Sequence, residues 1–267
     1  LLGVDLSLRR EATVADFMRH EKQVTKSERL RVEARLALRG VTRFHAPANF
    51  VDAHRIRIVD HGGAETLIRG EKILIATGSS PLQPPEFPFV DDPVHDSNEI
   101  LELKALPKKL IVIGGGVIGS EYAGTFAALG VEVHLVDGRA SLMPFLDAEI
   151  SQGLADAMTA NGVRFHWQEK VVKCDASRSG DVILTMSSGA ELAGDGVLVC
   201  AGRSSNTGSL NLAAAGLTPG KRGLVQVGAH FESTEVPHIY GAGDVIGRPA
   251  LAATGIEQAR VAVFHAF

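Results

Sequence analysis

The chain has 267 residues, of which 45% are hydrophobic and 22% are charged, and its formal net charge is −4. This composition is typical of a folded α/β protein with one large or two ordinary domains, and the slightly acidic charge gives no basis for a nucleic-acid partner or an anionic membrane surface. No apolar run is long enough to span a bilayer and the start has no signal-peptide pattern, so we expect a cytoplasmic protein without a membrane partner.

The first hundred residues predict a long charged helix followed by short strands. Residues 9–39 carry apolar side chains at loosely helical spacing among many charges. The strands that we expect next cover residues 41–46, 48–51, 55–59, 65–69 and 72–79. The proline-rich segment 81–93 is predicted to be a linker, which places a first domain boundary near residue 100.

The strongest pattern in the chain is a dinucleotide-binding fingerprint. An apolar strand over 109–113 leads into the glycine turn 114–116 and then into a helix over 117–129. A second strand, 131–136, is followed directly by the acid Asp137. Strand, turn, helix and acid in this order predict a Rossmann-type βαβ unit that binds a dinucleotide.

Each glycine of the fingerprint has a physical role. Gly114 permits the tight turn, Gly116 lets the backbone approach a diphosphate, and Gly119 lets the helix pack closely on the strand. The diphosphate is then expected at the positive N-terminal end of the helix. Asp137 should accept hydrogen bonds from the adenosine ribose, which favours NAD, whereas Arg139 could hold the 2′-phosphate of NADP, so both coenzymes stay open.

The remainder of the chain predicts further strands and two helices. We expect helices over 147–161 and from 252 onward, and strands over 163–166, 170–175, 181–187, 196–203, 225–227 and 238–244. These elements set the expected domains at 1–100, 101–225 and 226–267.

Several single residues are weaker candidates. Glu121 lies in the first turn of the predicted helix, where a carboxylate can simply favour the helix dipole. Asp244 follows a Gly-x-Gly turn, where it could accept from a polyol or cap a helix. Cys174 and Cys200 lack the spacing of a redox pair or metal site, and the ten histidines show no HxxxH or HExxH spacing, so no metal site is predicted.

Four motifs occur together in a recognisable order. They are Ile75-Ala76-Thr77-Gly78-Ser79, Gly114-Gly115-Gly116-Val117-Ile118-Gly119-Ser120-Glu121, Ala201-Gly202-Arg203 with Asn206-Thr207, and Val236-Pro237-His238-Ile239-Tyr240 with Gly243-Asp244. Through these four motifs the chain resembles the pyridine nucleotide–disulfide oxidoreductase family of FAD-containing enzymes. The resemblance covers essentially the whole chain.

The resemblance implies two Rossmann-like, three-layer α/β domains, with an NAD(P) domain inserted into an incomplete FAD domain. It implies that NAD(P) is bound by Gly114, Gly115, Gly116, Val117, Ile118, Gly119, Glu121, Asp137, Arg139, Val171 and Gly202. It implies that FAD is bound by Ala46, Thr77, Gly78, Ser79, Arg203, Gly243, Asp244, Ala250, Leu251, Ala252 and Ala253. Glu121 would lie near both the nicotinamide and the flavin, which makes it the candidate catalytic residue.

The implied activity is hydride transfer between NAD(P)H, FAD and a second acceptor. The runs 145–150 and 244–249 are most similar to the pyridine nucleotide transhydrogenases of the family, in which the acceptor is another pyridine nucleotide. A disulfide reductase such as dihydrolipoamide dehydrogenase or mercuric reductase, and a nucleotide-binding fragment without turnover, stay open as alternatives. The family's first FAD strand, active-site segment and C-terminal dimerisation domain are expected outside this chain, so the parent protein is expected to be a homodimer or higher homo-oligomer.

Overall fold

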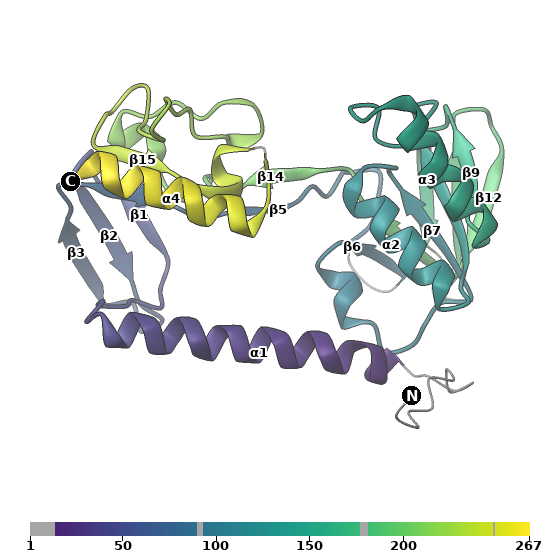
Figure 1. Ribbon diagram of the computed structural model, residues 1–267, viewed down its shortest axis with the longest axis horizontal. Coiled ribbons are helices and arrows are strands. Elements are labelled where there is room, and N and C mark those ends of the chain that lie inside the picture. The colour runs from purple at the N-terminus through teal and green to yellow at the C-terminus, as the bar shows by residue number, and fades with distance from the viewer. Residues whose placement is uncertain (1–13, 90–92, 177–180, 248) are drawn as a thin grey trace, which may run out of the picture. The chain divides into compact units, whose positions relative to one another are not determined.

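The computed structural model describes residues 14–89, 93–176, 181–247 and 249–267, which form two compact units (Figure 1). Each unit is assembled from two separate segments of the chain. Unit 1 comprises the chain up to Arg39 together with Pro81–Gly202, and unit 2 comprises Gly40–Ser80 together with Arg203–Phe267. Among the described residues, no helix is both long enough and apolar enough to cross a membrane.

Unit 1 is built on a five-stranded parallel sheet in the order β6-β13-β7-β8-β9. The strands are β6 (Val94–Asp96), β7 (Lys109–Ile113), β8 (Glu132–Asp137), β9 (Arg164–Trp167) and β13 (Gly196–Val199). The central strands are buried on both faces, as their continuous apolar sequences predict. The carboxyl ends of β7, β8 and β13 therefore meet at one edge of the sheet.

The two faces of this sheet are covered differently. On one face α2 (Val117–Ala128) and α3 (Ala148–Ala160) pack through Phe126 and Met158 against alternate sheet residues such as Leu135. The other face is covered by an antiparallel sheet, whose strands are β10 (Val171–Ala176), β11 (Val182–Met186) and β12 (Glu191–Gly194). The unit thus has three layers, one helical and two of sheet.

A long helix, α1 (Val14–Leu38), precedes these elements in the sequence (Figure 1). From residue 22 onward its side chains are almost all exposed. The ion pairs Arg29–Glu33, at 3.2 Å, and Arg31–Glu28, at 3.1 Å, link successive turns. Such pairs on one helix face stabilise it only slightly each. A short 3₁₀ helix, Glu99–Glu102, follows β6.

Unit 2 is centred on the parallel strand pair β4 (Ile73–Ile75) and β15 (Ile239–Gly241). An antiparallel sheet contains β1 (Ala48–Phe50), β2 (Arg55–Val59) and β3 (Glu65–Arg69), and a further pair contains β5 (Ser79–Pro81) and β14 (Arg203–Ser205). Its helices are α4 (Ala252–Ala266) and the 3₁₀ turns Leu212–Ala215, Lys221–Gly223 and Gly243–Ile246. Phe50, Ile75, Leu212, Ile239 and Val245 share one buried core.

Some predicted elements are wrong. Residues 41–46 form no strand; residues 41–45 are exposed, so no face of this segment is buried. Residues 225–227 make only an isolated bridge, between Val227 and Ser233. Strands β6 and β12 were not predicted, because each has only three or four residues and β6 carries the polar side chains of His95 and Asp96. The predicted helix before residue 14 lies outside the described residues.

The compact units change over at residues 80–81 and 202–203, whereas the sequence analysis places the NAD(P) domain at 101–225. Strand β6 lies before residue 101 and pairs with β13 of the parallel sheet. Residues beyond 202 join unit 2 because Asn206 donates its backbone N–H to the carbonyl oxygen of Gly78, at 2.9 Å. The assignment of the two units to FAD and NAD(P) stays a prediction.

Candidate nucleotide-binding sites

The glycines at the β7–α2 junction differ in the space around them. Gly114 and Gly119 have no room for a side chain, whereas Gly116 faces open space. Gly114 has a φ of +105°, and a Cβ there would lie 2.6 Å from the carbonyl oxygen of Cys200. A Cβ on Gly119 would collide with the carbonyl oxygen of Gly114, so α2 approaches the turn closely. A Cβ on Gly116, by contrast, would meet no heavy atom of another segment within 4 Å. The turn thus leaves an open approach to the backbone at the start of α2, which fits a diphosphate.

The predicted NAD(P) residues converge at one edge of the parallel sheet. Gly114 follows β7, Asp137 ends β8, and Gly202 comes three residues after β13. Because β8 and β13 flank β7 on opposite sides, this edge is the point at which the strand order reverses. Ligands of open parallel sheets bind at such switch points, beyond the carboxyl ends of the strands.

Asp137 is the best-connected side chain of this edge. Its Oδ2 accepts from the backbone N–H of Gly115 at 2.5 Å. Arg139 donates from Nε to Oδ1 at 2.8 Å and from Nη2 to Oδ2 at 2.6 Å, and its backbone N–H also donates to Oδ1. Burial raises the pKa of Asp137, but these hydrogen bonds outweigh it and hold the pKa below the ordinary value. The carboxylate is therefore ionised and fixed against the glycine turn.

The segment before β10 lies alongside the end of β8. Gln168 donates its backbone N–H to the carbonyl oxygen of Arg139 at 3.1 Å, and Glu169 donates to that of Asp137 at 3.2 Å. The side chain of Lys170 would lie 3.2 Å from a Cβ built on Gly138. Val171, a predicted NAD(P) residue, begins β10 directly after this segment, so the structure brings it beside the Asp137 loop.

Glu121 lies just beyond the first turn of α2, whereas the sequence analysis places it within that turn. The helix begins at Val117, its first turn contains no acidic residue, and Glu121 is the fifth residue. The helix dipole acts mainly on charges in the first turn, so it gives a weaker reason for this carboxylate. Val117 and Glu121 are exposed and Ile118 is half-buried.

Some of the predicted FAD residues of unit 2, among them Ser79, Arg203 and Asp244, also gather at one place, beyond the carboxyl ends of β4 and β15. Ser79 donates from Oγ to Oδ2 of Asp244 at 2.7 Å. Arg203 donates from Nε to Oγ of Ser79 and from Nη2 to its carbonyl oxygen, both at 2.7 Å, and Nε lies 3.9 Å from Oδ2 of Asp244. A Cβ on either Gly78 or Gly243 would meet no heavy atom of another segment within 4 Å. This leaves open space beside a half-buried carboxylate, which fits a ligand with hydroxyl and phosphate groups.

The helix-cap interpretation of Asp244 is wrong. Asp244 lies inside the 3₁₀ turn Gly243–Ile246, whose cap residue is Ala242 and makes no side-chain cap bond. The Asp244 side chain accepts from Ser79 instead.

Two residues outside the predicted set make hydrogen bonds to the backbone of this candidate FAD site. Gln258, which is only 6% exposed, accepts from the backbone N–H of Gly243 at 2.8 Å. The sequence offered one signal for Gln258. It is a polar residue four positions before Ala262 and therefore on the same, buried face of α4, where a polar side chain needs a hydrogen-bond partner. Asn206 donates from Nδ2 to the carbonyl oxygen of Thr77 at 3.0 Å.

The other predicted FAD residues are placed differently. Ala46 lies two residues before β1, in the segment that leads into the antiparallel sheet. Ala250 and Leu251 directly precede α4, and Ala252 and Ala253 begin it; all four are exposed. Among the residues that the structure describes, no side-chain hydrogen bond or ion pair joins these residues to Asp244, so their role in FAD binding stays a prediction.

Both cysteines are free thiols. Burial raises the pKa of Cys174 to about 11, and burial together with the nearby Asp96 raises that of Cys200 to about 12. Thiols with such values remain protonated near neutral pH and are poor nucleophiles.

Comparisons with known proteins show which family the chain belongs to. The family model described as "Pyridine nucleotide-disulphide oxidoreductase" matches residues 5–266. The chain is 38% identical, over its full length, to the soluble pyridine nucleotide transhydrogenase of Mycobacterium bovis BCG, of which it spans 57%. It is 44% identical over 215 residues to that of Marinobacter nauticus, covering 80% of this chain and 46% of the relative.

The chain is also similar in fold to solved structures. LpdA from Mycobacterium tuberculosis matches with a TM-score of 0.90 at 26% identity, over 96% of this chain and 57% of that protein. The HOCl-induced flavoprotein disulfide reductase RclA from Escherichia coli matches with a TM-score of 0.81 at 28% identity, over 91% and 55%. The chain therefore spans about half the length of the proteins it matches. With a family model covering nearly every residue, the chain belongs to the pyridine nucleotide-disulphide oxidoreductase family.

Proposed function

We propose that the chain carries the nucleotide sites of a flavoprotein oxidoreductase that binds FAD and NAD(P)(H) and transfers hydride from one pyridine nucleotide to another. The names of its relatives support this activity. The structural observation that carries it is the Asp137–Arg139 pair at the carboxyl end of β8.

A transhydrogenase has to accept NAD(H) and NADP(H), which differ only by the 2′-phosphate. An unpaired Asp137 would accept from the ribose hydroxyl of NAD but repel that phosphate. The Arg139 guanidinium, bound to both carboxylate oxygens, cancels this charge. Its side chain is 43% exposed, so it can turn toward a phosphate, while Asp137 stays anchored by the Gly115 N–H. One pair of residues thus provides an acceptor for NAD and a donor for NADP.

The second nucleotide of the proposal is FAD, in unit 2. When bound, FAD supplies a two-electron carrier that accepts and releases hydride. Asp244 would accept from ribityl hydroxyl groups, with Ser79 and Arg203 fixing its orientation. Thr77 and Gly78 would contribute backbone groups beside it. Around the nicotinamide we propose Gly202 and Glu121, with Glu121 acting to position the ring.

A disulfide reductase is the second candidate, because RclA is named one. The chain itself contains only Cys174 and Cys200, neither in a CxxxxC pair. Their raised pKa values also oppose thiolate chemistry. A nucleotide-binding module without turnover is the third candidate.

The test uses the purified full-length flavoprotein and measures reduction of thio-NAD⁺ with NADPH and, separately, with NADH as the donor. Arg139→Ala should raise the KM for NADPH about tenfold or more and leave that for NADH nearly unchanged, while Asp137→Ala should mainly weaken NADH. Arg164→Ala is the matched control, because Arg164 pairs with Glu132 at 3.0 Å at the opposite end of the same strands. Equal effects of Arg139→Ala on both coenzymes, or wild-type protein without NADPH–thio-NAD⁺ turnover, would contradict the proposal.

The cellular setting is part of the same proposal. The full-length protein would be cytoplasmic and would assemble as a homodimer or higher homo-oligomer through parts outside this chain. Pyridine nucleotides are its proposed partners, and neither a nucleic acid nor a membrane is among them.

A further inference from the structure

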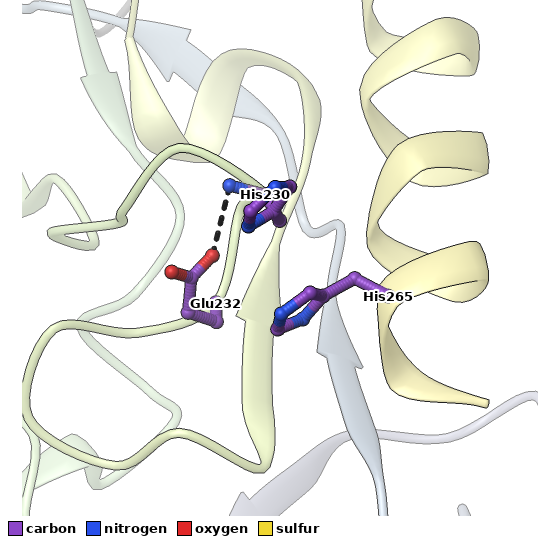
Figure 2. A group of neighbouring side chains, drawn as sticks. All are labelled: His230, Glu232 and His265. Carbon is purple, nitrogen blue, oxygen red and sulfur yellow. Dashed lines mark hydrogen bonds between the residues drawn. The ribbon is translucent and has the colours of Figure 1, made fainter.

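A cluster of metal-type ligands lies in unit 2, and it shares no residue with the two nucleotide sites. His230 and Glu232 come from the loop that precedes β15, and His265 comes from the last turn of α4 (Figure 2). One ligand atom from each of the three lies within 4.8 Å of the other two. The sequence analysis did not find this cluster, because Glu232 and His265 are far apart in the chain.

The loop backbone holds the first two ligands on a tight turn. Phe231, between them, has a φ of +66°, a value that residues other than glycine rarely adopt. The turn is closed by hydrogen bonds from Phe231 N to Gly228 O, at 3.2 Å, and from Gly228 N to Glu232 O, at 2.8 Å. Gly241 in β15 donates to the carbonyl oxygen of Phe231 at 3.0 Å. Strained backbone of this kind persists where its surroundings fix it, often at functional sites.

The carboxylate of Glu232 is fixed as well. Its Oε2 accepts from the backbone N–H of His230 at 2.9 Å. A Cβ on Gly228 would collide with Oε1 of Glu232, so the glycine leaves the space that the carboxylate fills. Hydrogen bonds from its own backbone N–H and from that of His230 hold the pKa of Glu232 below the ordinary value. The group is therefore an anion at neutral pH.

The two imidazoles lie face to face. Their centroids are 4.5 Å apart and their planes differ by 7°. Nδ1 of His265 lies 3.1 Å from the hydroxyl oxygen of Tyr240, which is only 3% exposed. When Nδ1–H donates to this oxygen, Nε2 keeps its lone pair for a metal, which is the usual arrangement behind a ligating histidine.

We propose that His230, Glu232 and His265 bind one divalent transition-metal cation, with Zn²⁺ as the best match. Two imidazole nitrogens and one carboxylate suit zinc, whereas calcium and magnesium prefer oxygen ligands alone. The exposed histidines leave the remaining coordination positions to water, so the cation exchanges with solvent. Bound there, it ties the end of α4 to the loop before β15.

The test is calorimetric titration of the metal-stripped full-length flavoprotein with Zn²⁺. Wild-type protein should bind one Zn²⁺ at this site, and His230→Ala and His265→Ala should each weaken that binding about tenfold or more. The matched control is His61→Ala, because His61 is an exposed histidine of the same unit whose ring centroid lies 6.2 Å from that of His45. Zinc affinities of the two cluster variants equal to wild type would overturn the proposal.

A second measurement separates coordination from a structural effect. Zn²⁺ should raise the thermal midpoint of the wild type and of His61→Ala, but not of His230→Ala, whose side chain lies on an exposed loop. Tyr240→Phe keeps the buried ring and removes only the hydrogen bond to His265, so it should weaken zinc binding less than His265→Ala does. A zinc-dependent rise that persists in His230→Ala refutes the site even if His265→Ala does not fold.

Discussion

The glycine turn after β7 allows one prediction that separates packing from ligand binding. Gly114→Ala and Gly116→Ala each add one methyl group, two residues apart in the same turn. Gly114 has a φ of +105°, and its added Cβ would lie 2.6 Å from the Cys200 carbonyl oxygen. Gly116 has a φ of −81°, which alanine adopts readily, and its Cβ would point into open space.

The structure therefore gives the two variants opposite profiles. At Gly114 the positive φ and the backbone overlap together should lower the free energy of unfolding by about 2–4 kcal/mol. The carbonyl oxygen of Cys200 cannot move aside cheaply, because the backbone N–H of Cys200 is hydrogen-bonded to the carbonyl oxygen of Ile113 at 2.8 Å. At Gly116 the loss should stay below about 1 kcal/mol, the difference expected between glycine and alanine at a helix cap. The methyl group at Gly116 instead occupies the approach of the diphosphate, so the Kd for NADH should rise about tenfold or more.

Urea unfolding followed by circular dichroism measures the first quantity, and quenching of protein fluorescence by NADH measures the second. Gly124→Ala is the control, because it lies within α2 and its Cβ would also meet no heavy atom of another segment within 4 Å. It should bind NADH like the wild type. Wild-type NADH affinity in Gly116→Ala would refute the assignment of this open space to the diphosphate, and wild-type stability of Gly114→Ala would refute the packing argument.

Three further outcomes follow from the described contacts. Asp244→Asn should reduce FAD retention, measured by flavin absorbance after desalting, because the amide presents one acceptor oxygen where the carboxylate has two; Ser79→Ala should reduce it less, and full retention in both would contradict the site. Native Cys174 and Cys200 should resist iodoacetamide at pH 8, where about one thiol in a thousand or fewer is ionised, and Cys174 should react first as the pH is raised. The pKa of Asp137 is lowered in the folded state, so its contribution to the free energy of unfolding is fully present above about pH 4, the ordinary value. That contribution is lost as the pH falls through the folded-state pKa. Acid should therefore lower the free energy of unfolding of the wild type more than that of Asp137→Asn.

The local part of the fold could be predicted from the sequence. The bounds of β7 agree with the prediction, and those of α2 differ by one residue, because strand, glycine turn and helix succeed one another within a short stretch. Asp137 could be found for the same reason. The three layers of unit 1 also follow from the family resemblance. That β10, β11 and β12 cover the second face of the parallel sheet could be learned only from the tertiary structure.

Contacts between distant segments could not be predicted. In the proposed NAD(P) site, the choice between NAD and NADP turns on the rotamer of Arg139, which here pairs with Asp137, and no sequence pattern specifies a rotamer. Segment 41–46 has the composition of a strand, but it finds no partner strand. The ligands His230 and His265 meet only because α4 lies against the loop before β15 (Figure 2).

The interleaving of the two units has a consequence for biosynthesis. Strand β4 ends at Ile75, and its parallel partner β15 begins at Ile239. A ribosome adds the intervening stretch of about 160 residues in roughly 8–30 s. During that time the Pro81–Gly202 segment emerges with all five strands of its parallel sheet, so it can fold while the β15-facing edge of β4 still lacks its neighbour. Such an unpaired edge is a target for chaperones and for aggregation, which makes the speed of translation past Gly202 a determinant of the yield of folded protein.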